Sequence, residues 1–131
     1  MSSIFSKIVS GKIPCYKVAE DQNYLAFLDA FPIVYGHVLV IPKKEVDNIL
    51  DLDSKEYLGL WEFSKMVATA MYKTIDCKRI GISVIGLEVP HVHVHLIPIN
   101  KISDIDFTQE KKQFSIKKMT EISKKIKNNL P

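Results

Sequence analysis

His91-Val92-His93-Val94-His95-Leu96-Ile97-Pro98 places three histidines at alternate positions, with apolar residues between them. Because a β-strand repeats every two residues, the three imidazoles project from one face, and the valines and Leu96 from the other. The valines and Leu96 suit a core. Three imidazoles on one face do not, since each buried ring needs hydrogen-bond partners and neighbouring cations repel each other. We therefore predict a functional site on the histidine face.

Two kinds of chemistry fit these histidines and a fourth, His37, which opens another strand-like run. In the first, they bind a metal, because imidazole is the commonest zinc ligand. Strand residues i and i+4 lie roughly 13 Å apart, so only two of the three could share an ion, with His37 or a carboxylate completing the set. In the second, one imidazole attacks phosphorus while its neighbours orient it, hold phosphate oxygens and protonate the leaving group. With an ordinary pKa of about 6.5, histidine is available as a neutral nucleophile.

The rest of the chain predicts an α+β fold. A short helix capped by Ser2 or Ser3 carries Ile4, Phe5, Ile8 and Val9 at helical spacing and ends at Gly11. A long helix over 53–75 begins with a capping box, Asp53 and Glu56. Ser115 caps a C-terminal helix with Ile116, Met119, Ile122 and Ile126 inward. Strands are expected over 16–18, 24–29, 37–41, 79–85 and 91–97, and they form an antiparallel sheet of about five strands.

Composition narrows the class of protein. A length of 131 residues fits a single domain over 1–131. No apolar run approaches the roughly 20 residues of a membrane span, and the N-terminus lacks the order of a secretion signal, so we expect a cytoplasmic protein without membrane contact. Cys15 and Cys77 are isolated and make no disulfide framework. The lysine-rich C-terminal segment predicts a solvated helix face rather than a nucleic-acid site, because no aromatic or arginine interleaves it.

The apolar residues of the long helix cover more than one face. They are Tyr57, Leu58, Leu60, Trp61, Phe63, Met66, Val67, Ala68 and Met71. One stripe suffices to pack on a sheet, so a second implies another covering surface. A partner subunit is the simplest candidate, which predicts a homodimer.

His91 to Pro98 resembles the histidine-triad signature, His-φ-His-φ-His-φ-φ, of the HIT superfamily. Three further stretches are similar to its Hint branch in order and spacing: Ile4 to Ile8 with Ile13-Pro14, Leu25 to Asp29, and Gly36 to Lys43. The resemblance implies a HIT-like fold, a homodimer, and a purine nucleotide substrate such as an AMP derivative, with no cofactor or metal.

The resemblance also implies roles for individual residues. His93 would attack the α-phosphorus and form a nucleotidyl-histidine that water hydrolyses, as in a nucleoside phosphoramidase. His91 and His95 would orient it and contact phosphate oxygens, with His37 in support. Asp29 would bind the ribose hydroxyls, although an Asp at a strand end also caps turns. Phe5, Ile8, Ile13 and Leu28 would form the slot for the base, although such residues equally suit a core.

Other functions stay open. They are a nucleotide-binding HIT module with weak or no turnover, a dinucleoside polyphosphate hydrolase and, weakest, a metal-dependent hydrolase. The module would bind AMP tightly without turnover that depends on His93, and the metal-dependent enzyme would lose its activity to a chelator.

Three departures from the family pattern bear on these roles. The segment Val84 to Pro90 lacks the expected Asn-x-Gly and Gly-Gln-Ser-like stretches. Within it, Glu88 replaces a small hydroxyl residue beside the phosphate. A carboxylate there repels the phosphate unless it points away, is protonated or serves as an acid. Ser3-Ile4-Phe5-Ser6 stands where zinc-containing relatives have Cys-Ile-Phe-Cys, so no structural zinc is expected. Glu45 replaces a histidine that often follows Pro-Lys-Lys. We predict no role for Glu45 from the sequence.

Overall fold

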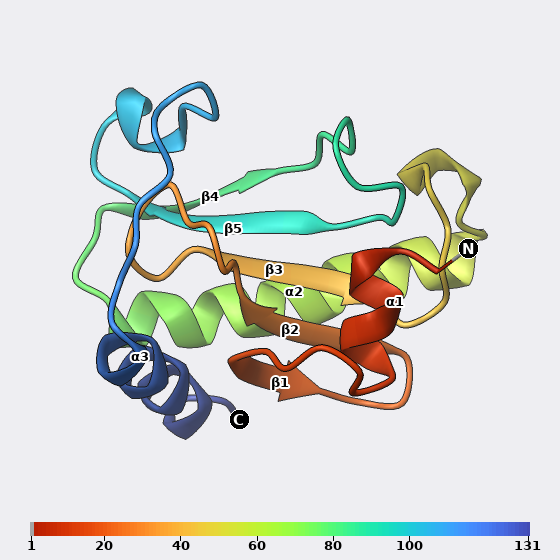
Figure 1. Cartoon of the computed structure of the whole chain (residues 1–131), viewed down its shortest axis with the longest axis horizontal. Coiled ribbons are helices and arrows are strands. Elements are labelled where there is room, and N and C mark those ends of the chain that lie inside the picture. Colours follow the sequence, from red (N-terminus) through yellow and green to blue (C-terminus); the bar gives the residue numbers. More distant parts are fainter. Residues whose placement is uncertain (1) are drawn as a thin grey trace.

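The computed structural model describes residues 2–131 as one antiparallel sheet with helices on both of its faces (Figure 1). The strand order is β1-β2-β3-β5-β4, and every neighbouring pair is antiparallel. This confirms the predicted α+β fold with five strands, one long helix and one C-terminal helix. The elements are α1 (Ile4–Val9), β1 (Lys17–Glu20), β2 (Tyr24–Leu28), β3 (Val38–Pro42), the 3-10 turn Ile49–Asp51, α2 (Ser54–Thr74), β4 (Arg79–Ser83), β5 (Val94–Ile99), the 3-10 turn Ile102–Ile105 and α3 (Ile116–Asn128).

The two faces of the sheet carry separate apolar clusters, because successive strand residues point to opposite sides. Val38, Val40, Val94 and Leu96 face α2 and α3, where they meet buried residues that include Leu60, Val67, Met71, Ile122 and Ile126. Leu25, Phe27, Leu39 and Ile41 face α1 and pack with its Phe5. The sheet therefore has an α2 side and an α1 side.

Side-chain caps begin the three α-helices, as the sequence predicts. Ser3, Asp53 and Ser115 each accept a hydrogen bond from the backbone N–H three residues ahead. Such caps satisfy amide groups that have no partner within the helix. Ile116 is an exception to the prediction for α3: it is the first helical residue and is 75% exposed, whereas Met119, Ile122 and Ile126 are buried.

The strand predicted from residue 91 begins only at Val94. Its neighbour β3 ends at Pro42, a residue without a backbone N–H, and β4 ends at Ser83, opposite His95. Ahead of β5, the Val92 N–H bonds instead to the carbonyl of Val46 in a loop. His91 and His93 therefore lie in an ordered loop leading into β5, and strand alternation does not set their direction.

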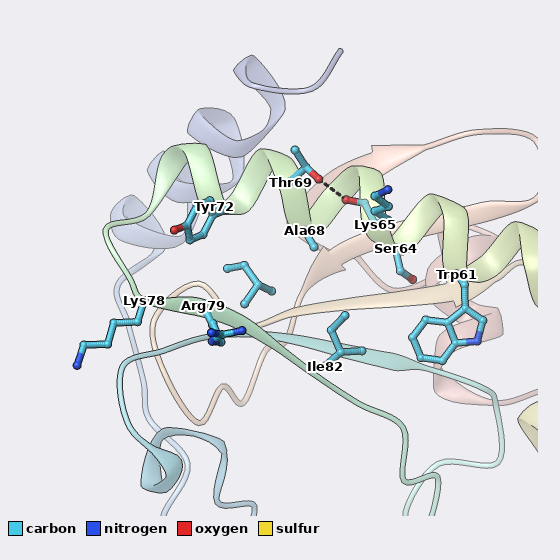
Figure 2. A pocket seen from close by; sticks show the side chains of 10 residues that line it. Trp61, Ser64, Lys65, Ala68, Thr69, Tyr72, Lys78, Arg79 and Ile82 are labelled. Carbon is cyan, nitrogen blue, oxygen red and sulfur yellow. Dashed lines mark hydrogen bonds between the residues drawn. The ribbon is translucent and has the colours of Figure 1, made fainter.

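A groove of about 660 Å³ lies between α2 and β4 on the α2 side of the sheet (Figure 2). Trp61, Lys65 and Tyr72 approach it from the helix, and Arg79 and Ile82 from β4. β4 is an edge of the sheet, so no strand within residues 2–131 pairs with its outer side. No helix in this part of the chain is long and apolar enough to cross a membrane.

Candidate active site

The four histidines come together from two segments of the chain, one at the start of β3 and one leading into β5. His37 directly precedes β3, and His95 is the second residue of β5, where it pairs with Leu39. His91 and His93 follow each other in the loop before β5. All four side chains are buried, with at most 8% exposed. The structure thus brings together the four residues that the sequence singled out.

The ring of His93 is held by a backbone carbonyl. Its Nδ1 lies 2.7 Å from the carbonyl oxygen of His91. A carbonyl oxygen only accepts hydrogen bonds, so Nδ1 carries a proton, and in the neutral ring Nε2 keeps its lone pair. That tautomer leaves the ring nitrogen remote from the backbone free to act as a nucleophile.

A chain of hydrogen bonds fixes the proton positions on His37 and His95. The backbone N–H of Ile33 donates to His37 Nδ1 at 3.2 Å, so the proton of His37 is on Nε2. His37 Nε2 lies 2.9 Å from His95 Nδ1 and donates to it. His95 must then carry its own proton on Nε2. Its free N–H is a donor suited to a phosphate oxygen.

His37 and His95 stay neutral near pH 7. Burial lowers the pKa of His37 to about 3, with Lys111 and His93 adding to the effect. Burial also lowers the pKa of His95 to about 3, and His37 and His93 lower it further. We expected adjacent imidazoles to be unsuited to burial. The structure corrects that view, because burial lowers the pKa of His37, His91 and His95, and each of the four rings has a hydrogen-bond partner.

His91 is bonded on both ring nitrogens. Its Nε2 donates to the carbonyl of Pro42 at 2.8 Å, so its Nδ1 accepts from the hydroxyl of Ser3, also at 2.8 Å. Burial lowers its pKa as well. With both nitrogens engaged and the side chain fully buried, His91 holds the site together. Its ring presents no free donor to a ligand.

Asp29 follows β2 and does two things. One carboxylate oxygen accepts from the backbone N–H of Phe31 at 2.9 Å, which is the turn-capping alternative foreseen from the sequence. The other lies 3.6 Å from His37 Nε2. The side chain is 19% exposed, so it is accessible at the edge of the histidine cluster.

The residues predicted to form the base slot lie on both sides of the sheet. Phe5 packs edge-on against His93 and His91, with ring centroids 5.0 and 5.8 Å apart, and Ile8 lies against the same cluster. Ile13 is half-buried just after α1. Leu28 lies apart from them, because alternation along β2 turns it to the α2 side. Phe27 lies on the α1 side instead, and its ring centroid is 5.7 Å from that of Phe5. The sequence could have indicated this, because Phe27 precedes Asp29 by two residues and so shares its side of the strand.

Glu88 lies exposed in the loop between β4 and β5. Within residues 2–131, no hydrogen bond joins its side chain to the histidines. The adjacent Val89 packs against the Phe5 cluster, and its carbonyl accepts the N–H of His91. The backbone of this loop therefore supports the site, while the Glu88 carboxylate points to solvent.

Phe107 forms part of the site although the sequence did not predict it. Its ring lies edge-on to His95 at 4.7 Å and to His37 at 6.4 Å. Lys111 Nζ lies 5.8 Å from the centre of the Phe107 ring. Both residues belong to the irregular segment between β5 and α3, where no periodic pattern marks them.

Asp29, His37 and His95 place one ligand atom each within 4.8 Å of the others. The metal alternative expected two histidines of 91, 93 and 95 with His37 or a carboxylate, whereas this set contains only one of the three, His95. In addition, His37 Nε2 and His95 Nδ1 are directly hydrogen-bonded, and His37 Nδ1 receives the N–H of Ile33. The donor atoms are thus engaged with one another, and the geometry favours an orienting chain over a metal site.

Comparisons with known proteins agree with the resemblance seen in the sequence. Residues 10–102 match the family model of the HIT domain. An uncharacterized HIT-like protein of Borreliella burgdorferi is 34% identical, over 97% of each chain. The adenosine 5′-monophosphoramidase of Schizosaccharomyces pombe is 38% identical over 75% of this chain and 74% of its own. A crystal structure of a zinc-bound histidine triad family protein from Mycobacterium smegmatis superposes with a TM-score of 0.83, at 25% identity, covering 98% of this chain and 93% of that one.

Proposed function

The chain belongs to the HIT family, and we propose that it cleaves a substituent from the α-phosphate of a nucleoside monophosphate through a covalent nucleotidyl-His93. One observation carries the proposal. The carbonyl of His91 holds a proton on Nδ1 of His93, so in the neutral ring Nε2 is the oriented nitrogen whose lone pair can attack phosphorus.

The reaction has two steps. In the first, His93 Nε2 forms a bond to phosphorus, and the bond from phosphorus to the substituent breaks. The substituent leaves with the bonding electrons and takes up a proton from water. In the second, water attacks phosphorus and gives its proton to the hydroxide left by the first step, while the bond from phosphorus to His93 Nε2 breaks and the nucleoside monophosphate is released. The Nε2–H of His95 donates to a phosphate oxygen in both steps, where charge accumulates.

The substrate that fits best is a purine nucleotide, such as an AMP phosphoramidate. Phe5, Ile8 and Phe27 belong to one apolar cluster next to His93 where the base can pack, and the half-buried Ile13 follows α1 in the sequence. The accessible carboxylate oxygen of Asp29 is placed to accept from the ribose hydroxyls. The name of the S. pombe relative, an adenosine 5′-monophosphoramidase, supports the same class of substrate.

The test is hydrolysis of an adenosine phosphoramidate with EDTA present, comparing the wild type with His93→Ala. We expect turnover by the wild type and a loss of at least about 10³-fold in the variant, since loss of a nucleophile has effects of that order or larger. Wild type quenched with denaturant at alkaline pH, where the phosphorus–nitrogen bond survives, should carry an adenylyl group on the peptide that contains His93. Turnover that survives His93→Ala would refute the proposal.

A nucleotide-binding module with little turnover is the second candidate, favoured by the unusual loop Val84 to Pro90. It predicts AMP binding by calorimetry without hydrolysis of the phosphoramidate or of a dinucleoside polyphosphate. Hydrolysis of the dinucleoside polyphosphate alone would identify a different leaving group at the same site. Activity that EDTA abolishes would favour the metal-dependent hydrolase.

We also propose that the protein is a homodimer joined at the groove between α2 and β4. Tyr72 and Ile82 are about half exposed there, and within residues 2–131 the buried Trp61 Nε1 has no hydrogen-bond partner. A second copy would cover this surface and extend the sheet at its β4 edge. Light scattering should give twice the chain mass for the wild type and a smaller mass for Ile82→Asp. A monomeric wild type would refute the dimer.

A further inference from the structure

Two of the three departures from the family pattern meet in space. Ser3 and Ser6 lie at the start of α1, and Glu45 lies about 40 residues away, just after β3. Glu45 Oε1 accepts the backbone N–H of Ser3 at 2.6 Å and the hydroxyl of Ser6 at 2.7 Å. The Ser3 hydroxyl donates to His91 Nδ1 at 2.8 Å and accepts from the Ser6 N–H at 3.0 Å. We call this set, Ser3, Ser6 and Glu45, the N-terminal clamp.

The clamp is connected to the proposed nucleophile by short hydrogen bonds. Its Ser3 hydroxyl is hydrogen-bonded to Nδ1 of His91, and the carbonyl of Pro42 is hydrogen-bonded to Nε2. These two bonds fix the orientation of the ring. The backbone carbonyl of the same residue, His91, accepts the hydrogen bond from His93 Nδ1. The clamped helix also carries Phe5, whose ring packs against His93. The placement of α1 thus affects His93 from two directions.

The clamp does not fit a zinc ion. The resemblance gives zinc-containing relatives cysteines at the positions of Ser3 and Ser6, and serine hydroxyls are poor zinc ligands. His91 Nδ1 already accepts a hydrogen bond from the Ser3 hydroxyl, and that hydroxyl accepts one from the Ser6 N–H. The Ser3 hydroxyl and both ring nitrogens of His91 are thus engaged by other protein groups.

We propose that Ser3 and Glu45 are positioning residues that hold α1 against His91 by hydrogen bonds alone, and so orient His93 without a metal. This inference rests on the proposed function for its effect on turnover. Its structural part, the fixed ring of His91, does not depend on that function.

Glu45 suits this role because one oxygen accepts from two groups on α1. The Ser3 N–H and the Ser6 hydroxyl lower its pKa to about 2, so it is ionised across the working pH range. Charged acceptors make the shorter and stronger hydrogen bonds. Two titratable groups change the pKa of His91: Glu45 raises it and His93 lowers it.

The experiment compares Ser3→Ala and Glu45→Ala with Asp47→Asn. Asp47 is an exposed acid on the same loop, and within residues 2–131 its side chain makes no hydrogen bond. The first readout is the ring ¹⁵N spectrum of His91 across pH 4–8. The Ser3 hydroxyl stabilises the neutral ring by donating to Nδ1. Ser3→Ala removes this donor, so the pKa of His91 should rise. The Nδ1 signal should shift in both clamp variants and stay unchanged in Asp47→Asn.

The second readout is kcat on the adenosine phosphoramidate. We expect a fall of about tenfold in Ser3→Ala and Glu45→Ala, and none in Asp47→Asn. Ser3→Thr and Glu45→Gln should restore most of kcat, because a threonine hydroxyl and an amide oxygen can make the same bonds. Rescue by Glu45→Gln would show that geometry rather than charge is responsible. The wild type should also purify with well under one zinc per chain.

The two readouts separate the possible failures. If the wild type does not turn over the substrate, the proposed function fails, and the His91 spectra still decide the clamp. Unchanged His91 signals in Ser3→Ala and Glu45→Ala would overturn the inference. So would one zinc per chain whose removal shifts the His91 signals. If Ser3→Ala does not fold because it loses the helix cap, Glu45→Ala leaves that cap in place and carries the test.

Discussion

The two sides of the sheet are built from the same strands but held by different forces. On the α2 side, Val38, Val40, Val94 and Leu96 pack against helices through apolar contacts. On the α1 side, His95 lies one residue from both Val94 and Leu96 along β5, and its environment is a network of directional hydrogen bonds. Alternation along one strand therefore places a core residue and a candidate catalytic residue next to each other.

The difference separates what makes the protein fold from what makes the site. Apolar packing stabilises in proportion to buried area and tolerates small shifts. The histidine network depends on which nitrogen carries each proton, and one changed partner alters the tautomer. Substitutions on the α2 side should hence act on stability, and substitutions on the α1 side on activity and pH dependence.

The largest effect should come from His93→Asn. The Asn amide can still donate to the carbonyl of His91, as His93 Nδ1 does, but it offers no nucleophile. Turnover of the adenosine phosphoramidate should fall by at least about 10³-fold, while the melting temperature changes by only a few degrees. Steady-state kinetics and thermal denaturation of the same sample check both halves. A large loss of stability would contradict the separation of the two sides.

Leu96→Ala should give the opposite result. Leu96 is fully buried on the α2 side, and removing its side chain leaves a cavity between the sheet and α2. We expect a loss of about 2–5 kcal/mol in the free energy of unfolding, measured in urea. At a temperature where the variant stays folded, KM and kcat should change by less than about threefold. A kcat that fell with stability would show that the α2 side also sets the site.

Most of the fold could be predicted from the sequence, because it depends on patterns within single segments. The capping residues Asp53 and Ser115 and the β-branched run of β3 are local signals of this kind. The start of β5 was not predicted correctly. It depends on where β3 and β4 stop, which is a property of the neighbours and not of residues 91–97.

The site divides in the same way. Regular spacing and the family resemblance identified the four histidines and Asp29. They did not identify Phe107, which reaches His95 from a segment without a pattern. Nor did they show that Glu45 contacts Ser3, because that pairing joins positions 42 residues apart. Contacts of this sort follow from the assembled fold alone.

A smaller effect should appear in the acid stability. The pKa values of His37 and His95 are about 3 in the folded protein and about 6.5 in the unfolded chain. Between these values the unfolded chain binds more protons, so stability is fully present above about pH 6.5 and falls as the pH drops toward 3. His37→Gln should reduce this slope by up to about 1.4 kcal/mol per pH unit. Urea unfolding at pH 7, 6 and 5 measures it, and an unchanged slope would contradict the buried neutral pair.

The smallest effect concerns the cover that Phe107 gives to the histidines. Phe107→Ala exposes His95 and His37, so their pKa values should rise from about 3 as burial decreases. The edge-on aromatic contact should account for about 0.5–1.5 kcal/mol of the loss in stability, beyond the loss from the apolar area that the ring buries. Lys111→Gln is the control, because it removes a cation that also lowers these pKa values but leaves the ring in place. Its effect should vanish in 0.5 M salt, since Lys111 is exposed, whereas the effect of Phe107→Ala should persist. Histidine titrations by NMR at two salt concentrations distinguish the two, and equal salt dependence would mean that Phe107 acts only by holding Lys111 nearby.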